Sequence, residues 1–377
     1  MLIFAAILAI FVYGMIAAML GAILPDLSER FHLTPAQNGV IAFAQALGLM
    51  IASLGVGPLL DTQGDKIGLV LGLIFIAIAL FALPKSGSYG AIVFLLFLLG
   101  MGGGIVVTGA NALSSAASPE HRATALNLVN LFFGLGGFAT PFLSANLFQR
   151  KWVRLCYTVA ALTLVTLAVQ VMAPMPAPAG HAGFVLAEVG PILGHPLLPL
   201  CGLFLFLYIG CEVGVWNWLV RHLIAQGIPE SRALNILSWG FALGLLAGRV
   251  GVSPILIHVP AVTVTLAASI AMTVTTFLML RVSSPGAAAA LVFLAGVAMA
   301  PVFPTTLAIV ASAFPRMTGA ALGFAITCGW AGLAVSSRII GAIAGSDPAR
   351  LRKALLVIPG SAALMIVINL AIQAALR

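Results

Sequence analysis

The sequence predicts an all-α membrane protein with twelve transmembrane helices, and three observations lead to this prediction. Of its 377 residues, 62% are hydrophobic and only 7% are charged, whereas a soluble domain carries about 25% charged residues. Twelve apolar runs approach or exceed the roughly 20 residues that a helix needs to cross a bilayer. The longest polar interruption divides these runs into six and six.

The composition also excludes several classes of protein. With 17 Lys and Arg against 9 Asp and Glu, the net charge is +8, but the basic residues form no stripe, so no nucleic-acid partner is expected. The content of charged residues is too low for the surface of a soluble enzyme of this size, and also too low for a disordered chain. A β-barrel is excluded because its strands alternate apolar and polar residues over about 10 positions, and these runs are continuous.

The polar breaks between the apolar runs set the expected spans. The first run has no basic residues before it and exceeds the apolar region of a signal peptide, so it is expected to be the first span. The twelve spans are 2–24, 38–60, 67–84, 89–114, 123–148, 154–173, 197–220, 232–254, 259–281, 286–311, 318–343 and 353–375.

The interruption between the sixth and seventh spans, Ala173–Pro196, is rich in proline. Two sets of six spans joined by such a segment are typical of a transporter built from repeats. We therefore expect an N-terminal six-helix bundle (1–173), a cytoplasmic inter-bundle linker (174–196) and a C-terminal six-helix bundle (197–377).

The sequence shows no catalytic or metal-binding pattern. The four cysteines lie inside apolar runs and suit packing, and the six histidines lie in loops or at span ends. Serine–histidine–acid arrangements and phosphate-binding loops are also absent. We expect no metal, no cofactor and no enzymatic activity.

The loop between the second and third spans contains an acid and a base in a short turn, Gly57-Pro58-Leu59-Leu60-Asp61-Thr62-Gln63-Gly64-Asp65-Lys66. Asp61 is expected to cap the following helix, and Lys66 to reach lipid headgroups or a neighbouring helix end. The segment resembles the loop signature of the major facilitator superfamily, G-x-L-x-D-x-x-G-x-[K/R], at Gly57, Leu59, Asp61, Gly64 and Lys66. The resemblance implies a cytoplasmic loop that helps to lock the outward-open state.

Three further segments resemble the fucose–proton symporter and glucose-permease branch of that superfamily. They are Gly100-Met101-Gly102-Gly103-Gly104 with the residues up to Pro141, Tyr208-Ile209-Gly210-Cys211-Glu212 with Trp216, and Gly296 with Ala300-Pro301-Val302-Phe303-Pro304-Thr305. The resemblance implies the major facilitator fold: two pseudo-symmetric six-helix bundles around a central cavity, working by alternating access as a monomer.

Two departures from the branch concern proton coupling. The fucose symporters carry an aspartate near the end of the first span and a glutamate in the fourth, where this chain has Gly21 and Val107. Proton symport therefore does not follow from the resemblance. We expect either a co-transported proton that is carried through titration of Glu212, another co-transported cation, or no coupling.

Glu212 is the acid that lies well inside a span, and an ionisable group there marks a pathway or a structural pair. Tyr208, Glu212 and Trp216 are spaced by four residues and share one helix face. A carboxylate between two aromatic rings suits a sugar ring. Alternatively, Glu212 is a structural acid that pairs with Arg338. Arg338 is itself the second candidate, either as part of a gate formed with Glu212 or as a ligand for the carboxylate of a substrate. Arg249 is expected to snorkel or to act as the second-half partner of the Asp61 loop.

Neutral polar residues complete the expected substrate site. Asn130 occupies the place where the resemblance implies a sugar-contacting amide, and Asn127 is expected to hold helices together. The other expected substrate contacts, besides Tyr208, Glu212 and Trp216, are Gln45, Asn111, Asn217, Asn235, Trp239 and Trp330.

Two signals disagree on orientation. The loop signature places both termini in the cytoplasm, which gives the inner side five Lys and Arg residues and the outer side eleven. The positive-inside rule predicts the reverse. We follow the loop and span-four signatures because they agree with each other.

The sequence therefore predicts a multi-pass transporter of the cell (inner) membrane that moves a monosaccharide or a related polar solute. The alternatives are an exporter of organic anions or drugs that uses Arg338, and a non-transporting membrane sensor. A sensor would need an output domain, and no long polar segment in the sequence supplies one.

Overall fold

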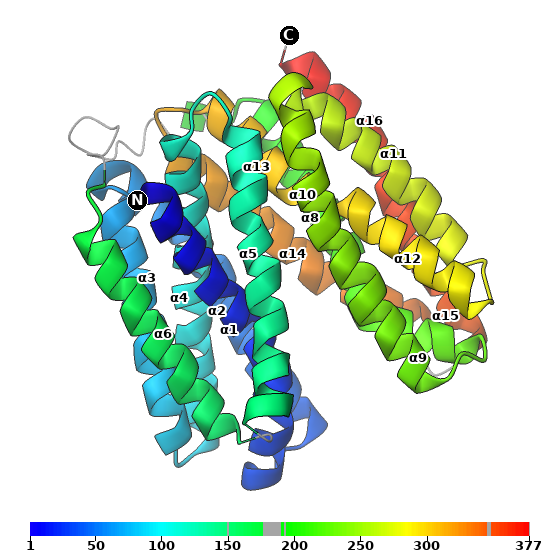
Figure 1. Cartoon of the computed structure of the whole chain (residues 1–377), viewed down its shortest axis with the longest axis horizontal. Helices are drawn as coiled ribbons and strands as arrows, with labels where there is room; N and C mark the ends of the chain where they lie inside the picture. The colour runs from blue at the N-terminus through cyan, green and yellow to red at the C-terminus, as the bar shows by residue number, and fades with distance from the viewer. Residues whose placement is uncertain (149–150, 176–189, 192–193, 345–347, 377) are drawn as a thin grey trace. The chain divides into compact units, whose positions relative to one another are not determined.

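A computed structural model describes residues 1–148, 151–175, 190–191, 194–344 and 348–376. The regular structure of these residues is helical (Figure 1). The helices of the first half are α1 (Leu2–Phe31), α2 (Pro35–Gln63), α3 (Asp65–Ala82), the short helix η1 (Leu83–Lys85), α4 (Tyr89–Ala117), α5 (Arg122–Phe142), the π-helical turn η2 (Leu143–Leu147) and α6 (Trp152–Met172).

The second half has more interruptions within its spans. Its elements are α8 (Leu197–Ala225), α9 (Glu230–Asn235), the π-helical segment η3 (Ile236–Ala242), α10 (Leu243–His258), α11 (Ala261–Met279), α12 (Pro285–Met299), α13 (Val302–Ala313), α14 (Thr318–Ala344), α15 (Pro348–Leu355) and α16 (Val357–Ala375).

Twelve helical segments of the described chain are long and apolar enough to cross a membrane, which confirms the predicted number of spans. Several helices extend past the predicted ends because a helix continues after the apolar run stops. The first helix, for example, continues through Pro25 to Phe31 and ends where His32 adopts a left-handed conformation, φ 50°.

Proline explains two places where a predicted span is not one regular helix. Pro141 lies inside α5, and the π-helical turn η2 follows directly. The predicted span 286–311 is broken between Met299 and Val302, at Pro301. Proline has no N–H to donate and its ring clashes with the preceding turn, which weakens a helix at that point. One helix ends just before Pro301, whereas α5 continues through Pro141 and changes to a π-helical turn two residues later.

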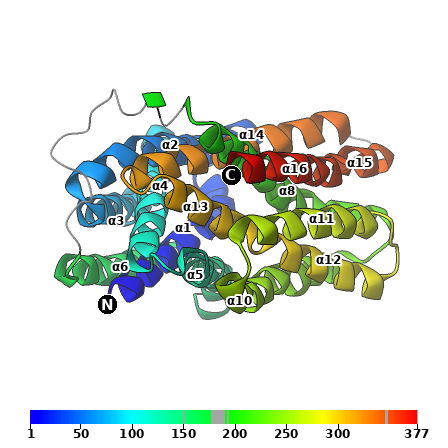
Figure 2. The same ribbon diagram turned by 90° about the horizontal axis from the view of Figure 1, so that it is seen from above.

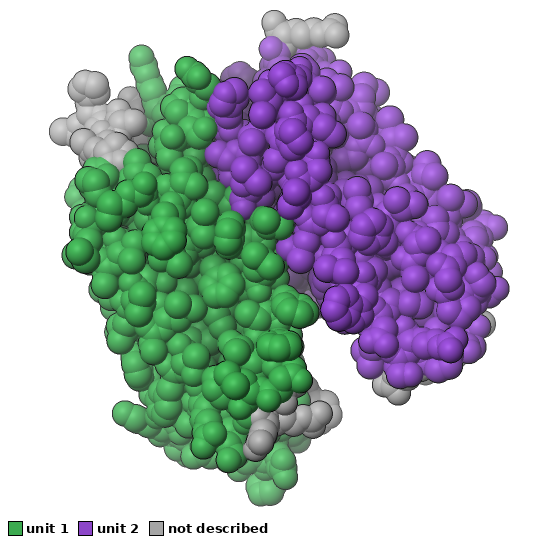
Figure 3. Space-filling model, in the orientation of Figure 1, with its two compact units in different colours: residues 1–120, 129–189, 314–327 green, residues 121–128, 190–313, 328–377 purple. Residues whose placement is uncertain are grey.

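The described chain forms two compact units (Figure 3). Unit 1 contains residues 1–120, 129–189 and 314–327, and unit 2 contains residues 121–128, 190–313 and 328–377. Each unit therefore includes a short segment from the other half of the sequence. The predicted bundles 1–173 and 197–377 stay a prediction, and most of the predicted linker 174–196 lies outside the described residues.

Within unit 1, α4 packs against α1, α2 and α3, and α6 lies along α3 (Figures 1 and 2). Within unit 2, α16 packs against α8 and α11, and α12 packs against α10 and α11. Figures 1 and 2 both show α11 beside α16.

Glycine permits the contact between α2 and α4. A Cβ atom added to Gly48 of α2 would overlap the carbonyl oxygen of Phe97, and one added to Gly100 of α4 would overlap the carbonyl oxygen of Gln45. Small residues allow helix backbones to approach closely where lipid gives no hydrophobic drive for association. The glycines of the fourth span therefore act in packing.

We predict that Gly48→Ala lowers the free energy of unfolding by roughly 1–3 kcal/mol, because the added methyl group must push α2 away from α4. Gly55→Ala is the matched control on the same helix, since a Cβ there meets no atom within 4 Å. Thermal unfolding in detergent measures both variants. Equal melting temperatures for the two would contradict the packing role.

Candidate functional site

Asp61 connects α2 to the beginning of α14. One carboxylate oxygen accepts a hydrogen bond from the N–H of Gly319 at 2.7 Å, and the other accepts one from the N–H of Ala320 at 2.8 Å. Both donors belong to the first turn of α14, where backbone N–H groups lack partners within the helix. The expectation that Asp61 caps the helix after its loop is therefore wrong: it caps α14, while the N-cap residue of α3 is Gly64 and no side chain caps that helix.

The backbones of α2 and α14 approach closely around this cap. A Cβ at Gly57 would overlap Ala320, and one at Gly319 would lie 2.6 Å from the carbonyl oxygen of Gly57. Further along, the Thr327 hydroxyl donates to the carbonyl of Met50 at 3.3 Å. Gly57 of the loop signature thus lies within α2, where it allows a helix contact.

Lys66, the basic end of the signature, donates to the carbonyl of Ala173 at 3.3 Å. Ala173 is the C-cap residue directly after α6, so a positive charge lies at a helix C-terminus, where it is favourable. This is the neighbouring helix end that the sequence predicted as one of two alternatives.

Two of the predicted amides meet between α4 and α5. Asn111 and Asn130 are both buried. The Asn130 amide donates to the Asn111 carbonyl oxygen at 2.7 Å, and the Asn111 amide donates to the Val107 carbonyl at 2.7 Å. One turn before Asn111, the buried hydroxyl of Thr108 has no hydrogen-bond partner among the described residues. Sequence reasoning passed over Thr108, although its spacing from Asn111 places both on one helix face.

The start of α5 is bound to the second half of the sequence, within unit 2. The Asn127 amide donates to the Thr305 hydroxyl of α13 at 2.9 Å. Thr124 donates to the carbonyl of Ser253 at 3.0 Å, and Arg122 donates to that of Ala311 at 3.4 Å. The contacts of Asn127 agree with the helix-holding role that the sequence predicted. Thr305 was quoted only as part of a motif, and nothing in the sequence indicates its partner.

The predicted face of α8 changes from buried to exposed along its length. Tyr208 is fully buried, Glu212 is half-buried, and Trp216 is 38% exposed. The ring of Trp216 lies edge-on to that of Phe241, with 5.2 Å between the two ring centroids. The Tyr208 hydroxyl lies within hydrogen-bonding reach of the Glu212 carboxylate, one turn further along α8. It lies within electrostatic range of both Glu212 and Arg249.

The two arginines lie differently from what the sequence suggested. Arg249 is only 4% exposed, so snorkelling, which would bring its guanidinium to water, is wrong. Arg338 is exposed, and the described structure shows no ion pair between Arg338 and Glu212. The buried cation near Tyr208 is Arg249.

The remaining predicted residues are spread over several elements. Gln45 is half-buried and donates to the carbonyl of Ile16 at 3.5 Å. Asn217 and Asn235 are exposed, and Trp239 is 63% exposed within the π-helical segment η3. Trp330 is half-buried, and its ring N–H has no acceptor among the described residues.

Within the described ranges, no group of three or more His, Cys, Asp or Glu side chains is placed to hold a metal ion. The four cysteines, which all fall in described segments, are free thiols. The candidate residues are amides, aromatic rings and one acid, and these groups can hydrogen-bond to and stack against a hydroxyl-rich solute.

The comparisons with known proteins agree with the fold. The family model described as Major Facilitator Superfamily matches residues 6–346. The glucose/galactose transporter of Brucella abortus is 27% identical over 264 residues, 64% of this chain and 63% of that protein. The 4-hydroxybenzoate transporter PcaK of Pseudomonas aeruginosa is 32% identical over 142 residues, 37% of this chain and 32% of that protein.

Among solved structures, the transporter FucP in its outward conformation superposes with a TM-score of 0.86 at 17% identity, covering 98% of each chain. A likeness at this identity concerns the fold. The match to the Brucella abortus transporter spans just under two thirds of that relative's length.

We predict that Asp61→Ala frees the first turn of α14 and that hydrogen exchange at Gly319 and Ala320 becomes faster. Loss of an N-terminal cap costs about 0.5–2 kcal/mol. Hydrogen exchange followed by mass spectrometry on peptides that cover 316–324 measures the effect. Glu120→Ala, at an exposed acid, is the control and leaves this exchange unchanged. Protection that persists in Asp61→Ala would show that the carboxylate does not cap α14.

Proposed function

Because the chain belongs to the Major Facilitator Superfamily, we propose that it is a secondary transporter that moves a monosaccharide across the membrane by alternating access. The proposal rests first on the buried amide pair Asn111–Asn130 with the unpartnered hydroxyl of Thr108 beside it. A sugar hydroxyl both donates and accepts hydrogen bonds, so it can bind to an amide and to a hydroxyl at once.

The relatives support the same substrate class. The Brucella abortus relative is a glucose/galactose transporter, and a sugar substrate fits the aromatic rings and amides on α8, η3 and α14. Tyr208, Glu212 and Trp216, with Asn217, Asn235, Trp239, Trp330 and Gln45, are the other substrate contacts in this proposal.

Alternating access requires contacts between the two halves of the sequence to break and form again. Asp61 on α2 and the first turn of α14 make one such contact, and Asn127 with Thr305 makes another. We assign these contacts to gating. We also assign Lys66 to gating, since it lies in the same loop signature and donates to the carbonyl of Ala173 after α6.

The protein is a multi-pass membrane protein. We propose that it acts as a monomer in the cell (inner) membrane with both termini in the cytoplasm, following the loop signature. Labelling from outside the cell of a single cysteine placed at the exposed Glu120 position would overturn this orientation.

We predict that Asn130→Ala reduces uptake of radiolabelled hexose into proteoliposomes at least tenfold, because it removes a substrate contact and unpairs Asn111. Loss of a buried partner also costs about 1–3 kcal/mol of stability. Asn369→Ala is therefore the matched control, since Asn369 is another buried amide and donates to Thr265 at 2.7 Å. It should lower stability similarly and keep uptake. If the folded wild-type protein takes up no sugar from a panel, the proposal is rejected.

The second candidate function is export of an organic anion, which the exposed cation Arg338 and the partial match to a 4-hydroxybenzoate transporter favour. The two functions predict opposite results. For sugar transport coupled through Glu212, Glu212→Gln abolishes the response of uptake to an imposed pH gradient while Arg338→Ala has little effect. For anion export, Arg338→Ala abolishes ligand-induced thermal stabilisation by 4-hydroxybenzoate while Glu212→Gln retains it. Thermal shift and pH-jump uptake on both variants distinguish them.

A further inference from the structure

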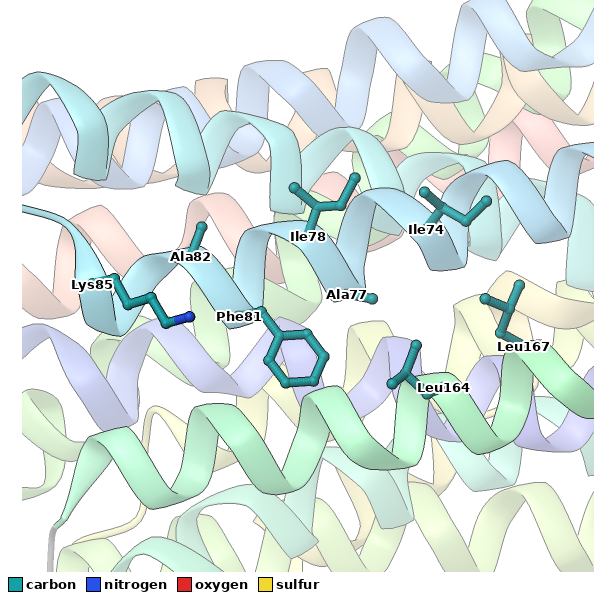
Figure 4. A pocket seen from close by; sticks show the side chains of 8 residues that line it. All are labelled: Ile74, Ala77, Ile78, Phe81, Ala82, Lys85, Leu164 and Leu167. Atoms are coloured by element: carbon teal, nitrogen blue, oxygen red, sulfur yellow. The ribbon is translucent and has the colours of Figure 1, made fainter.

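A groove between α3 and α6 in unit 1 lies outside the candidate substrate site. Its larger cavity has a volume of about 500 Å³ and is lined by Ile74, Ile78 and Phe81 of α3, by Leu164 and Leu167 of α6, and by Lys85. Figure 4 shows Phe81 directed toward α6 and the two leucines directed toward α3, with Lys85 at one end. No predicted substrate-binding residue lines it.

The groove continues toward the other end of α3. A second cavity of about 430 Å³ shares Ile74 with the first and extends to Val171 and Lys66. These two open apolar depressions, which we together call the α3–α6 groove, have a lysine at each end. From Lys66 to Lys85 the helix rises about 29 Å, close to the roughly 30 Å of a bilayer's hydrocarbon core.

The larger cavity has the length of one leaflet. Eleven residues separate Ile74 from Lys85, which corresponds to about 17 Å along the helix axis, or roughly half of the hydrocarbon core. Ile78 is 50% exposed and Leu164 is 44% exposed, so these walls are open to whatever surrounds the protein. In a membrane protein, that surrounding is acyl chain.

The polar end of this cavity is positive. Lys85 is exposed. Arg30 of α1 lies close to it, because its guanidinium donates to the carbonyl of Pro84, the residue before Lys85, at 3.3 Å. The guanidinium of Arg30 also lies 5.8 Å from the ring of Trp152, and tryptophan favours the headgroup region of a membrane. No acidic residue lines the cavity. The positive charge at this end therefore complements the phosphate of a lipid whose headgroup has a net negative charge.

Near Lys85, an aromatic side chain of α3 packs against one of α6 beside the groove. Phe81 of α3 lies 6.0 Å from Tyr157 of α6, which joins the two helices beside Lys85. We propose that an anionic phospholipid binds specifically in the α3–α6 groove, with one acyl chain between Ile74 and Phe81 and its phosphate on Lys85.

The test is native mass spectrometry of the full chain, purified from vesicles with equal amounts of phosphatidylglycerol and phosphatidylethanolamine. The wild type should retain phosphatidylglycerol in preference. In Lys85→Gln the ratio of the two bound lipids should fall about fivefold, which corresponds to the roughly 1 kcal/mol that one lysine contributes beside anionic lipid. Lys353→Gln, at an exposed lysine of α15, is the control and keeps the ratio.

A second variant tests the apolar part of the site. Ile78→Trp fills the cavity and should remove both retained lipids, whereas Ile270→Trp, at an isoleucine of α11 with 47% exposure, should not. An unchanged lipid ratio in Lys85→Gln would overturn the proposal, as would full lipid retention in Ile78→Trp. Detection of a dimer that Ile78→Trp dissociates would also overturn it, because a second copy of the chain would then occupy the groove.

Discussion

The constraint behind this structure is that the interior of a bilayer offers no hydrogen-bond partner to a peptide group. Each span must therefore be helical, and each interruption needs a local substitute. After Pro141 the chain continues as a π-helical turn, and at Pro301 one helix ends and another begins. The π-helical segment η3 carries Trp239, a candidate substrate contact. Such segments are common at functional sites, so the irregular backbone and the proposed site lie in the same helices.

The same constraint applies to side chains. Most buried hydroxyl groups in the described helices donate to a carbonyl one turn earlier, as Thr163 does to Val159 at 2.7 Å. Amides that cannot do so fully find one another, as Asn111 and Asn130 do. The exceptions are informative. The hydroxyl of Thr108 and the ring N–H of Trp330 lack partners in the described structure, and a buried polar group without a partner is costly. A ligand rich in hydroxyl groups would remove that cost.

The sequence predicted what depends on composition and failed where the result depends on contacts between distant residues. Apolar runs were enough for the number of spans, and the spacing of Tyr208, Glu212 and Trp216 was enough for their shared helix. The partner of Asp61 is 258 residues away in the chain, so local capping rules pointed to the wrong helix. Burial of Arg249 was likewise invisible, because a cation near a span end can snorkel or pack, and only the neighbouring helices decide.

In the proposed transport cycle, the contact of Asp61 with α14 must break and form again. It combines a bidentate carboxylate with backbones that touch at Gly57 and Gly319, so a small displacement breaks all of it at once. Breaking it removes two hydrogen bonds to a partly buried carboxylate, at a net cost of about 0.5–1.5 kcal/mol for each bond. A substrate can shift such an equilibrium only by binding one conformation more tightly than the other.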